Sequence, residues 1–537
     1  MTIGDQQLLL PGFPASYVIY YVSSVLAKAL SGATGQVQFS GAHDAVHTSV
    51  LDTLDPLLGG PGGSLCTMTG IYQIGTRIIP RNQVKWFGEG RSTVLAATAN
   101  LGANSIIKYI GADAGHPLTD SIIQYMTLDG TNMPAGYSTA KKGIDLRYTL
   151  RCVLDNLYVK NTIASGIGPD FNVEAIITNN VVENVGTVGQ VTGSNGIGCG
   201  SGGYSDEPTI IANNHVIGAQ DNGIIIEEQG SVGNWYIIDH NYTKACGNSG
   251  LAVNGGQNAI IANNIDNGSK HNLSLADNGA QQAKYVIVTG NRFMNATDDA
   301  VIMPKGASTD FIFSSNAIVG ATGHGMNLQG SRVLVVSSII RNNGKAGVIY
   351  SSATGADRQL LIIALNSIRN NSQSAGNTFD AIKLDSTTLA IKNFIVALNE
   401  LTDDQGVSNT QRYGYVQVTG AGLTNGLVCY NIFDNNKTAA VLLSGGRDST
   451  VKLRDNLGFL TEASGSASVA AAATTVVVTH GLGYTPSIND IIVIPQGAKN
   501  NATWWWVSNV TATQFTINVD IAPAGTALPF TWAVAMK

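Results

Sequence analysis

A single phrase occurs twice in GIIIEEQGSVGNWYIIDHN (residues 223–241) and GLAVNGGQNAIIANN (residues 250–264). Each copy starts with glycine and a short apolar run, passes through a turn, and ends a second apolar run in asparagine. From residue 143 to about residue 458 the closing residue recurs every 22 to 34 positions. The closing residues are Asn156, Asn180, Asn214, Asn241, Asn264, Asn291, Asn316, Ser338, Asn366, Asn399, Asn431 and Asn456.

Short strands separated by Gly/Asn turns at such a period predict a solenoid built from one strand-rich unit. Helical repeats are excluded, because no segment keeps a 3.6-residue apolar period for three turns. We therefore predict an all-β fold, a right-handed parallel β-helix, in which like residues stack about 4.8 Å apart on successive turns of the coil. Stacked asparagines can hydrogen-bond along such a column, which explains their recurrence better than turn propensity alone.

The composition narrows the classes of function. Hydrophobic residues make up 44% of the 537 residues and charged residues only 12%, with a net charge of -6. No basic block indicates nucleic acid or an anionic membrane surface as a partner. The dispersed Cys66, Cys152, Cys199, Cys246 and Cys429 are predicted to be buried thiols, with no metal site. Neither a secretion signal nor a membrane-spanning segment is expected.

Residues 37–95 resemble the start of the pectate-lyase-like β-helix superfamily, in which a helix covers the first turn of the coil. The matching residues are Asp44, Ala45, Gly62, Gly63, Gly70, Tyr72, Ile74, Gly88, Gly90, Thr93 and Leu95. The helix would begin with Asp44 as N-cap and bury Val46, Val50, Leu51 and Leu54. The superfamily contains lyases, hydrolases, epimerases and phage tailspikes, so the resemblance specifies the fold more closely than the reaction.

Four regions are predicted: an N-terminal segment (1–36), the cap and first turns (37–142), the β-helix with the active groove (143–460) and a C-terminal β-sandwich (461–537). Residues 463–475, ASGSASVAAAATT, are predicted to be a linker. The tail resembles C-terminal modules of phage tail fibres and spikes. That resemblance implies a homotrimer on a virion tail, acting outside the host cell, with Trp504–Trp506 as a subunit contact or, less favoured, a sugar platform.

The first apolar run of each repeat, which begins with Gly-Ile or a similar pair, is called the Gly-Ile phrase here. Aligning these phrases places the third and fifth residues of each strand on the outer surface. The fifth column contains Arg147, Asp170, Gly200, Glu227 and Asn254, and the sixth, at the start of the turn, contains Glu228, Asp277 and Lys305. Asp145 joins them from the third column. Ionisable residues therefore gather on the first half of the coil.

Asp170 and Glu227 lie two coil turns apart with Gly200 between them, a spacing that suits the two carboxyl groups of an inverting glycosidase. We predict Glu227 as the acid and Asp170 as the base, with repulsion from Glu228 raising the pKa of Glu227. Glu228 and Asp277 are the reserve acids. The predicted substrate-binding residues are Asp277, Asp145, Arg147, Tyr204, Asn254 and Lys305, and loops 185–194 and 202–208 are predicted to wall the groove.

The leading hypothesis is a tailspike-like depolymerase that hydrolyses a bacterial surface polysaccharide without a cofactor. A lyase or epimerase acting on uronic acids is the alternative, and it would need a base with Arg147, Lys305 or a calcium ion to neutralise the substrate carboxylate. An acid-rich groove disfavours it, as does the lack of a histidine in GPDF (168–171). A non-catalytic glycan-binding spike is the third hypothesis.

Overall fold

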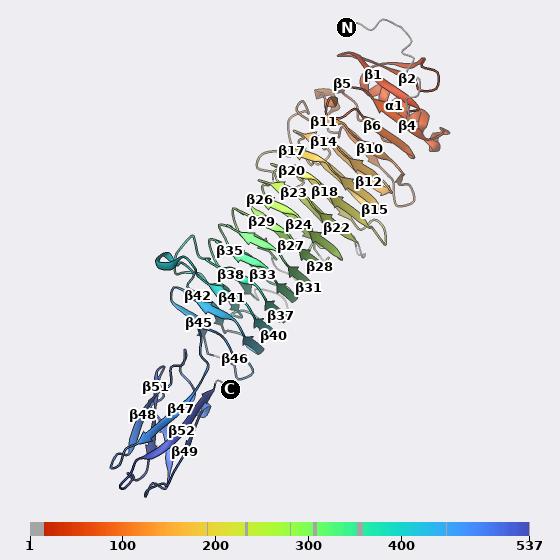
Figure 1. Cartoon of the computed structure of the whole chain (residues 1–537). Coiled ribbons are helices and arrows are strands. Elements are labelled where there is room, and N and C mark those ends of the chain that lie inside the picture. The colour runs from red at the N-terminus through yellow and green to blue at the C-terminus, as the bar shows by residue number, and fades with distance from the viewer. Residues whose placement is uncertain are drawn as a thin grey trace. The chain divides into compact units, whose positions relative to one another are not determined.

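The computed structural model describes residues 15–190, 192–230, 235–279, 281–303, 309–351, 358–446 and 448–535. Over these residues the protein is β-structure apart from one α-helix, α1 (His43–Leu54), and short 3-10 turns at Pro56–Leu58, Ala99–Leu101, Gly406–Ser408 and Ile488–Asp490. The chain divides into two compact units, Met1–Ser331 and Arg332–Lys537. Figure 1 shows the order of their elements.

The first unit stacks short parallel strands into three sheets, named A, B and C here (Figure 1). Sheet A contains β4 (Gly63–Thr67), β6 (Val84–Gly88), β10 (Ile122–Gln124), β13 (Val153–Asp155), β16 (Ala175–Thr178), β19 (Thr209–Ala212), β22 (Tyr236–Asp239), β25 (Ala259–Ala262), β28 (Lys284–Thr289) and β31 (Thr309–Ser314). Sheet B contains β5 (Gly70–Ile74), β7 (Thr93–Ala97), β11 (Thr127–Asp129), β14 (Tyr158–Lys160), β17 (Val181–Glu183), β20 (His215–Ile217), β23 (Tyr242–Lys244), β26 (Ile265–Asn267), β29 (Arg292–Met294) and β32 (Ala317–Val319). Sheet C contains β8 (Ile107–Ile110), β12 (Ile144–Leu150), β15 (Ile167–Val173), β18 (Ile197–Ser201), β21 (Ile224–Glu228), β24 (Ser249–Asn254), β27 (His271–Ala276), β30 (Val301–Ile302) and β33 (Met326–Leu328), and β9 (Leu118–Thr119) pairs with β12. Before the coil, β1 (Tyr17–Ser23), β2 (Leu26–Ser31) and β3 (Val37–Gly41) pair antiparallel, and β1 also pairs in parallel with β4.

This arrangement is the predicted parallel β-helix. Each turn of the coil contributes one strand to each sheet, so neighbours in a sheet come from successive turns. Alternate side chains point into a common core, as Tyr236 and Ile238 of β22 do, while Ile237 between them faces outward.

The corner between sheets A and B explains the repeated asparagine. At Asn213 the backbone takes a left-handed φ of 55°, which asparagine tolerates, and turns the chain. The next residue, Asn214, points inward and is fully buried. Its Nδ2 donates to Asn241 Oδ1 (3.0 Å) and its Oδ1 accepts from Asn180 Nδ2 (2.9 Å). The predicted column of amide hydrogen bonds is confirmed, and it continues through Asn264, Asn291 and Asn316.

The column begins one turn later than predicted. Asn156 occupies the left-handed corner position (φ 50°), and its Nδ2 donates to the exposed carboxylate of Asp155. Leu157 takes the inward place instead, and its backbone N–H donates to Asn180 Oδ1 (2.9 Å). The inclusion of Asn156 in the column is therefore wrong by one residue.

The second unit repeats the architecture and adds a different module. Its sheet A strands are β34 (Ser331–Val336), β37 (Arg358–Ala364), β40 (Ile391–Ala397), β43 (Leu423–Cys429) and β46 (Lys452–Arg454). Its sheet B strands are β35 (Ile339–Arg341), β38 (Ser367–Arg369), β41 (Glu400–Thr402) and β44 (Ile432–Asp434), and its sheet C strands are β36 (Val348–Ser351), β39 (Ile382–Asp385), β42 (Tyr413–Val418) and β45 (Ala439–Ser444). The predicted column runs from Ser338, whose N–H donates to Asn366, through Asn399 and Asn431 to Asn456.

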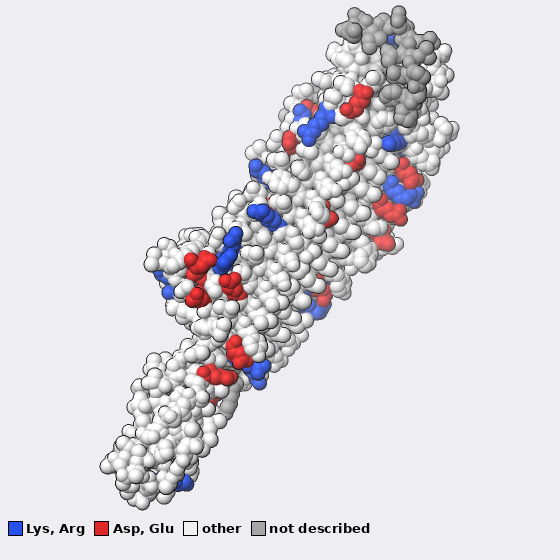
Figure 2. All heavy atoms as spheres, viewed as in Figure 1, with Lys and Arg blue, Asp and Glu red and all other residues white. Residues whose placement is uncertain are grey.

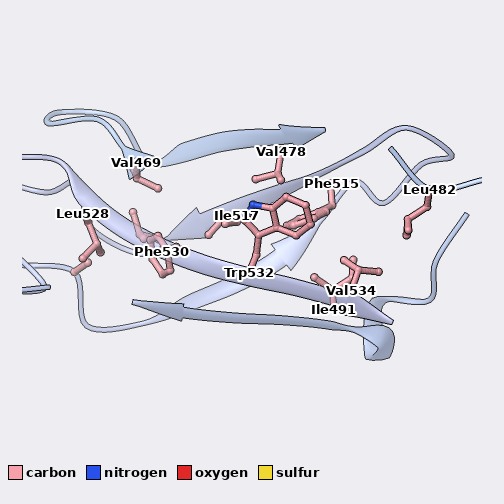
Figure 3. Packing of buried hydrophobic residues seen from close by; sticks show 12 residues of the cluster. Val469, Val478, Leu482, Ile491, Phe515, Ile517, Leu528, Phe530, Trp532 and Val534 are labelled. Atoms are coloured by element: carbon pink, nitrogen blue, oxygen red, sulfur yellow. The ribbon is translucent and has the colours of Figure 1, made fainter. Parts of the chain in front are cut away.

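The C-terminal module is the predicted antiparallel β-sandwich. One sheet has the order β47 (Glu462–Val469), β52 (Leu528–Ala535), β49 (Ile491–Pro495), and the other β48 (Thr475–Thr479), β51 (Gln514–Val519), β50 (Trp505–Ser508). Figure 3 shows Phe515, Phe530 and Trp532 between the two sheets. Trp505 packs on Phe530 (centroids 6.4 Å apart), whereas Trp504 and Trp506 are exposed.

The predicted linker at 463–475 is wrong, because β47 covers all of its first half and pairs with β52 along its full length. The small residues of this segment have a packing reason. A Cβ at Gly465 would lie 2.8 Å from the Trp532 ring, so only glycine lets the strand approach the indole this closely.

Helix α1 covers the first coil turns and buries Val46, Val50, Leu51 and Leu54, as predicted. The N-cap is Ala42, however, so the prediction that Asp44 caps the helix is wrong. The Asp44 carboxylate instead accepts backbone N–H groups of Gly75 (3.2 Å) and Thr76 (2.7 Å), which ties the helix to a loop of the first coil turns.

All five cysteines are free and buried, which confirms the prediction of buried thiols. Burial raises the pKa of Cys66 to about 12 and that of Cys152 to about 11. These thiols therefore stay protonated and unreactive near neutral pH.

No helix within the described ranges has the length and apolar character needed to cross a membrane.

Candidate functional site

Sheet C aligns the outward row that the sequence predicts. Arg147 of β12 pairs with Asp170 of β15, Asp170 pairs with Gly200 of β18, and Gly200 pairs with Glu227 of β21. Glu227 in turn pairs with Asn254 of β24. Parallel strands lie about 4.8 Å apart, so the backbones of Asp170 and Glu227 are about 9.6 Å apart on one face.

Asp170 and Glu227 line the same pocket, with a volume of about 250 Å³. Gly200 forms its floor between them: a Cβ there would lie 2.6 Å from both Asp170 Oδ1 and Gln229 Nε2. The pocket exists because this position has no side chain. Its remaining lining residues are Thr139, Lys142, Arg147, Ser165, Gly193, Asn195, Gly198, Cys199, Ile225 and Gln229.

The surroundings of Asp170 raise its pKa overall, because burial outweighs the groups that favour its ionised form. The backbone N–H of Gly200 donates to Asp170 Oδ1 (2.8 Å), and Arg147 Nε lies 3.7 Å from Oδ2. Burial raises the pKa of Asp170, while the Lys142 charge, the Gly200 hydrogen bond and Arg147 act in the opposite direction. The carboxylate is thus desolvated but has three groups that stabilise its negative charge.

Glu227 lies in a contrasting environment. Burial raises its pKa, and the negative charge of Asp170 raises it further. Both carboxyl groups have raised pKa values, but the groups that act against the rise are those around Asp170. The pair therefore has the asymmetry that an acid and a base need.

Glu228 is not on the outer surface, and the prediction that placed it there is wrong. Its side chain is fully buried, accepting from Ser201 Oγ (3.0 Å) and from the backbone N–H of Gly230 (2.9 Å). Alternation along β21 turns the residue after outward Glu227 inward. The charge that raises the pKa of Glu227 belongs to Asp170.

A second pocket of about 230 Å³ adjoins the first, sharing Thr139, Lys142 and Arg147 as lining residues. It contains Asp145, which is nearly buried and ion-paired with Lys142 (2.9 Å) and Lys108 (3.6 Å). Three cations and one carboxylate line this pocket. The prediction of an acid-rich groove is therefore wrong at this end, because cations outnumber carboxylates there. These cations could hold an anionic substituent of a substrate.

The two predicted loops differ in their relation to the pocket. Gly193 and Asn195, at the end of the first loop and just beyond it, line it. The second loop, residues 202–208, is folded onto Glu207, whose Oε1 accepts the N–H groups of Gly202, Gly203 and Tyr204. The Tyr204 ring meets Tyr148 edge-on, with centroids 6.0 Å apart. Tyr204 is thus part of an aromatic cluster rather than a free platform for a sugar.

The other predicted binding residues lie further along. Asn254 extends the row next to Glu227. Asp277 accepts the N–H of Ala283 (3.2 Å) and closes the loop after β27. Lys305 lies outside the described residues.

Sequence reasoning missed Lys108, Lys142, Asn195 and Gln229. Lys142 and Asn195 each directly precede a Gly-Ile phrase, and Gln229 directly follows one. A search of the residues flanking each phrase would have found these three. The charges are conspicuous because they are rare: Figure 2 shows charged side chains as small separate groups on a mostly uncharged surface.

Comparisons with known proteins agree with this fold. Residues 195–362 match the family model described as the right handed beta helix region. No curated protein matches the chain.

Among solved structures, the tailspike protein of E. coli bacteriophage HK620, in complex with a pentasaccharide, is similar, with a TM-score of 0.53 and 10% identity, over 91% of this chain and 89% of that one. The AlgE6 A-module of Azotobacter vinelandii mannuronan C-5 epimerase gives a TM-score of 0.43 and 14% identity, over 77% and 94% of the chains. The Pseudomonas phage phi297 tailspike gp61 gives 0.40 and 10%, over 92% of each. The stacked sheets and the family match together identify a right-handed parallel β-helix, the fold that the HK620 tailspike shares.

Proposed function

We propose that the protein hydrolyses glycosidic bonds in a bacterial surface polysaccharide, with Glu227 as general acid and Asp170 as general base. The observation that supports this most is the shared pocket, which two carboxyl groups line on either side of Gly200, with cations and a backbone donor acting on Asp170 and a neighbouring negative charge acting on Glu227. Similarity in fold to a tailspike whose structure holds a pentasaccharide supports a glycan as substrate.

The chemistry follows from these positions. Glu227 donates its proton to the leaving glycosidic oxygen while Asp170 removes a proton from a water that attacks the other face of the sugar. Backbones about 9.6 Å apart allow the carboxyl groups the 6.5–9.5 Å, roughly, that leaves room for this water. The expected outcome is inversion at the anomeric carbon. No cofactor takes part in this route.

The proposal extends to where the protein acts. A homotrimer on a virion tail, meeting its polymer outside the host cell, fits a tailspike-like β-helix with a C-terminal β-sandwich. The exposed Trp504 and Trp506 of that sandwich are proposed as subunit contacts.

The test is incubation with capsular or O-antigen polysaccharides of candidate hosts, followed by assays for reducing ends and polymer mass. We expect new reducing ends with wild type and a loss of at least about 100-fold with Asp170→Asn or Glu227→Gln. Glu174→Gln removes an exposed acid just after β15 and should leave activity unchanged. Full activity in either pocket variant would refute the assignment.

A lyase or epimerase acting on uronic acids is the second candidate, favoured by Lys108, Lys142 and Arg147 in the adjoining pocket. These three cations can balance the carboxylate of a uronic acid substrate. Unsaturated, ultraviolet-absorbing ends would indicate a lyase. An altered sugar composition in an intact polymer would indicate an epimerase, and unchanged polymer would indicate a binding spike.

A further inference from the structure

The outer face of sheet A has a row that breaks the usual alternation of apolar and polar residues. Six successive strands, β16 to β31, each present an isoleucine outward, and the strand pairing puts these residues in register. The isoleucine row comprises Ile176, Ile210, Ile237, Ile260, Ile287 and Ile312. Each is between 37% and 41% exposed, although a solvated sheet face normally carries polar residues.

The residues beside the isoleucine row leave it standing as a ridge. The next outward position along the strands holds Thr178, Ala212, Asp239, Ala262, Thr289 and Ser314, which are short side chains. On the other side Trp235 is 58% and Tyr285 55% exposed. Over six strands the ridge extends about 24 Å with a step of about 4.8 Å.

The fold itself gives no reason for this row. The equivalent outward positions of sheet B include His215 and Arg292, and those of sheet C include Arg147, Asp170 and Glu227. Coil turns therefore accept polar residues on their outer faces. Six isoleucines at these exposures present on the order of 450 Å² of apolar surface, which is about the size of the largest patch on a typical monomer, and such a patch often has a function.

We propose that the isoleucine row is the surface through which copies of this chain associate, coil beside coil. A second copy presents the same row at the same step, so the side chains of one row can fit between those of the other along its whole length. The row itself contains no charge, and Asp239 is the one acid among the six short side chains beside it. With Trp235 and Tyr285 the surface reaches roughly 750 Å², close to the 800 Å² or so that each partner contributes to a standard interface.

The proposal does not depend on the reaction, because the row lies on sheet A and the carboxyl pair on sheet C. It assigns a specific surface to the assembly suggested above. If the catalytic assignment fails, the association surface still stands. If the association surface fails, the catalytic assignment still stands.

The first test is the mass of the full-length protein in solution, measured by sedimentation and light scattering across a concentration series. We expect an oligomer for wild type and a folded monomer, or association weakened at least about tenfold, for Ile210→Lys with Ile260→Lys. Ile265→Lys changes a 39% exposed isoleucine on sheet B and should leave the oligomer unchanged. Circular dichroism confirms that each variant is folded.

The second test places a cysteine at Ile237, in the middle of the row. Mild oxidation should then link copies covalently, because the native thiols are buried and do not compete. Ile71→Cys, at an exposed position on sheet B, should give little cross-linking.

A monomeric wild-type protein, or an oligomer unaffected by the lysine pair, would overturn the proposal. Row-dependent binding of a monomer to phosphatidylcholine vesicles would overturn it too, by assigning the row to a lipid surface.

Discussion

Asp170 and Glu227 are both carboxylic acids on the outer row of sheet C, and their different surroundings suit them to different roles. Asp170 has a backbone donor at 2.8 Å and two cations within its electrostatic reach, whereas Glu227 has only burial and the neighbouring negative charge. A general acid must hold its proton, and a general base must be free of one. Rates should therefore fall at low pH as Asp170 is protonated and at high pH as Glu227 ionises.

Lys142 provides the sharpest test of this asymmetry. Its charge lowers the pKa of Asp170, so Lys142→Met should move the acidic limb of the kcat/KM profile to higher pH. The alkaline limb, set by Glu227, should move less. Lys85→Met, on sheet A, serves as the control and should leave both limbs in place. An unshifted acidic limb in the Lys142 variant would contradict the electrostatic account.

Among the structural elements, the asparagine column shows most directly how the sequence defines the coil. Each buried amide donates along the axis and accepts from the turn before it, so removing one leaves its neighbours unsatisfied. Asn241→Ala would remove Asn241 Oδ1, the acceptor of the backbone N–H and of one Nδ2 hydrogen of Asn214, while Nδ2 keeps its bond to the Ile177 carbonyl. We expect it to cost about 2 kcal/mol or more, because each buried unpaired group costs about 1–3 kcal/mol.

Chemical denaturation of Asn241→Ala checks that expectation. Asn132→Ala, which changes an exposed asparagine, should stay within about 0.5 kcal/mol of wild type. Equal stability of the two variants would show that the column contributes little.

The sequence predicts the row on sheet C because the period of two and the Gly-Ile phrase together fix which residues share a face. The same alternation points the Glu228 side chain inward. Glu228 is the last residue before a loop, however, and alternation need not continue there, so the sequence also allowed an outward position. Lys108 lies in register with Asp145 but on β8, before the first aligned strand, and Lys142 directly precedes an aligned strand, so the aligned strands alone do not indicate either residue. The β47 strand was missed because its small residues match a tryptophan contributed by a distant segment.

At the scale of the whole molecule, each coil turn contacts mainly its neighbours, so stability is a local property. The C-terminal β-sandwich has its own core around Phe515, Phe530 and Trp532. Calorimetry should therefore show more than one unfolding transition. Asn241→Ala should lower one of them, and Gly465→Val, which collides with Trp532, should lower another. A single transition moved by both substitutions would show one cooperative unit.

The distance between the two carboxyl groups depends on how many strands of sheet C separate them. Excising one complete circuit, residues 181–214, would remove Gly200 and leave Asp170 and Glu227 on adjacent strands about 5 Å apart. That is the separation at which a carboxylate attacks the sugar directly and the anomeric configuration is retained. In a solenoid of this kind, the number of coil turns between the two carboxyl groups determines the stereochemistry of the product. Deleting one turn is enough to change it.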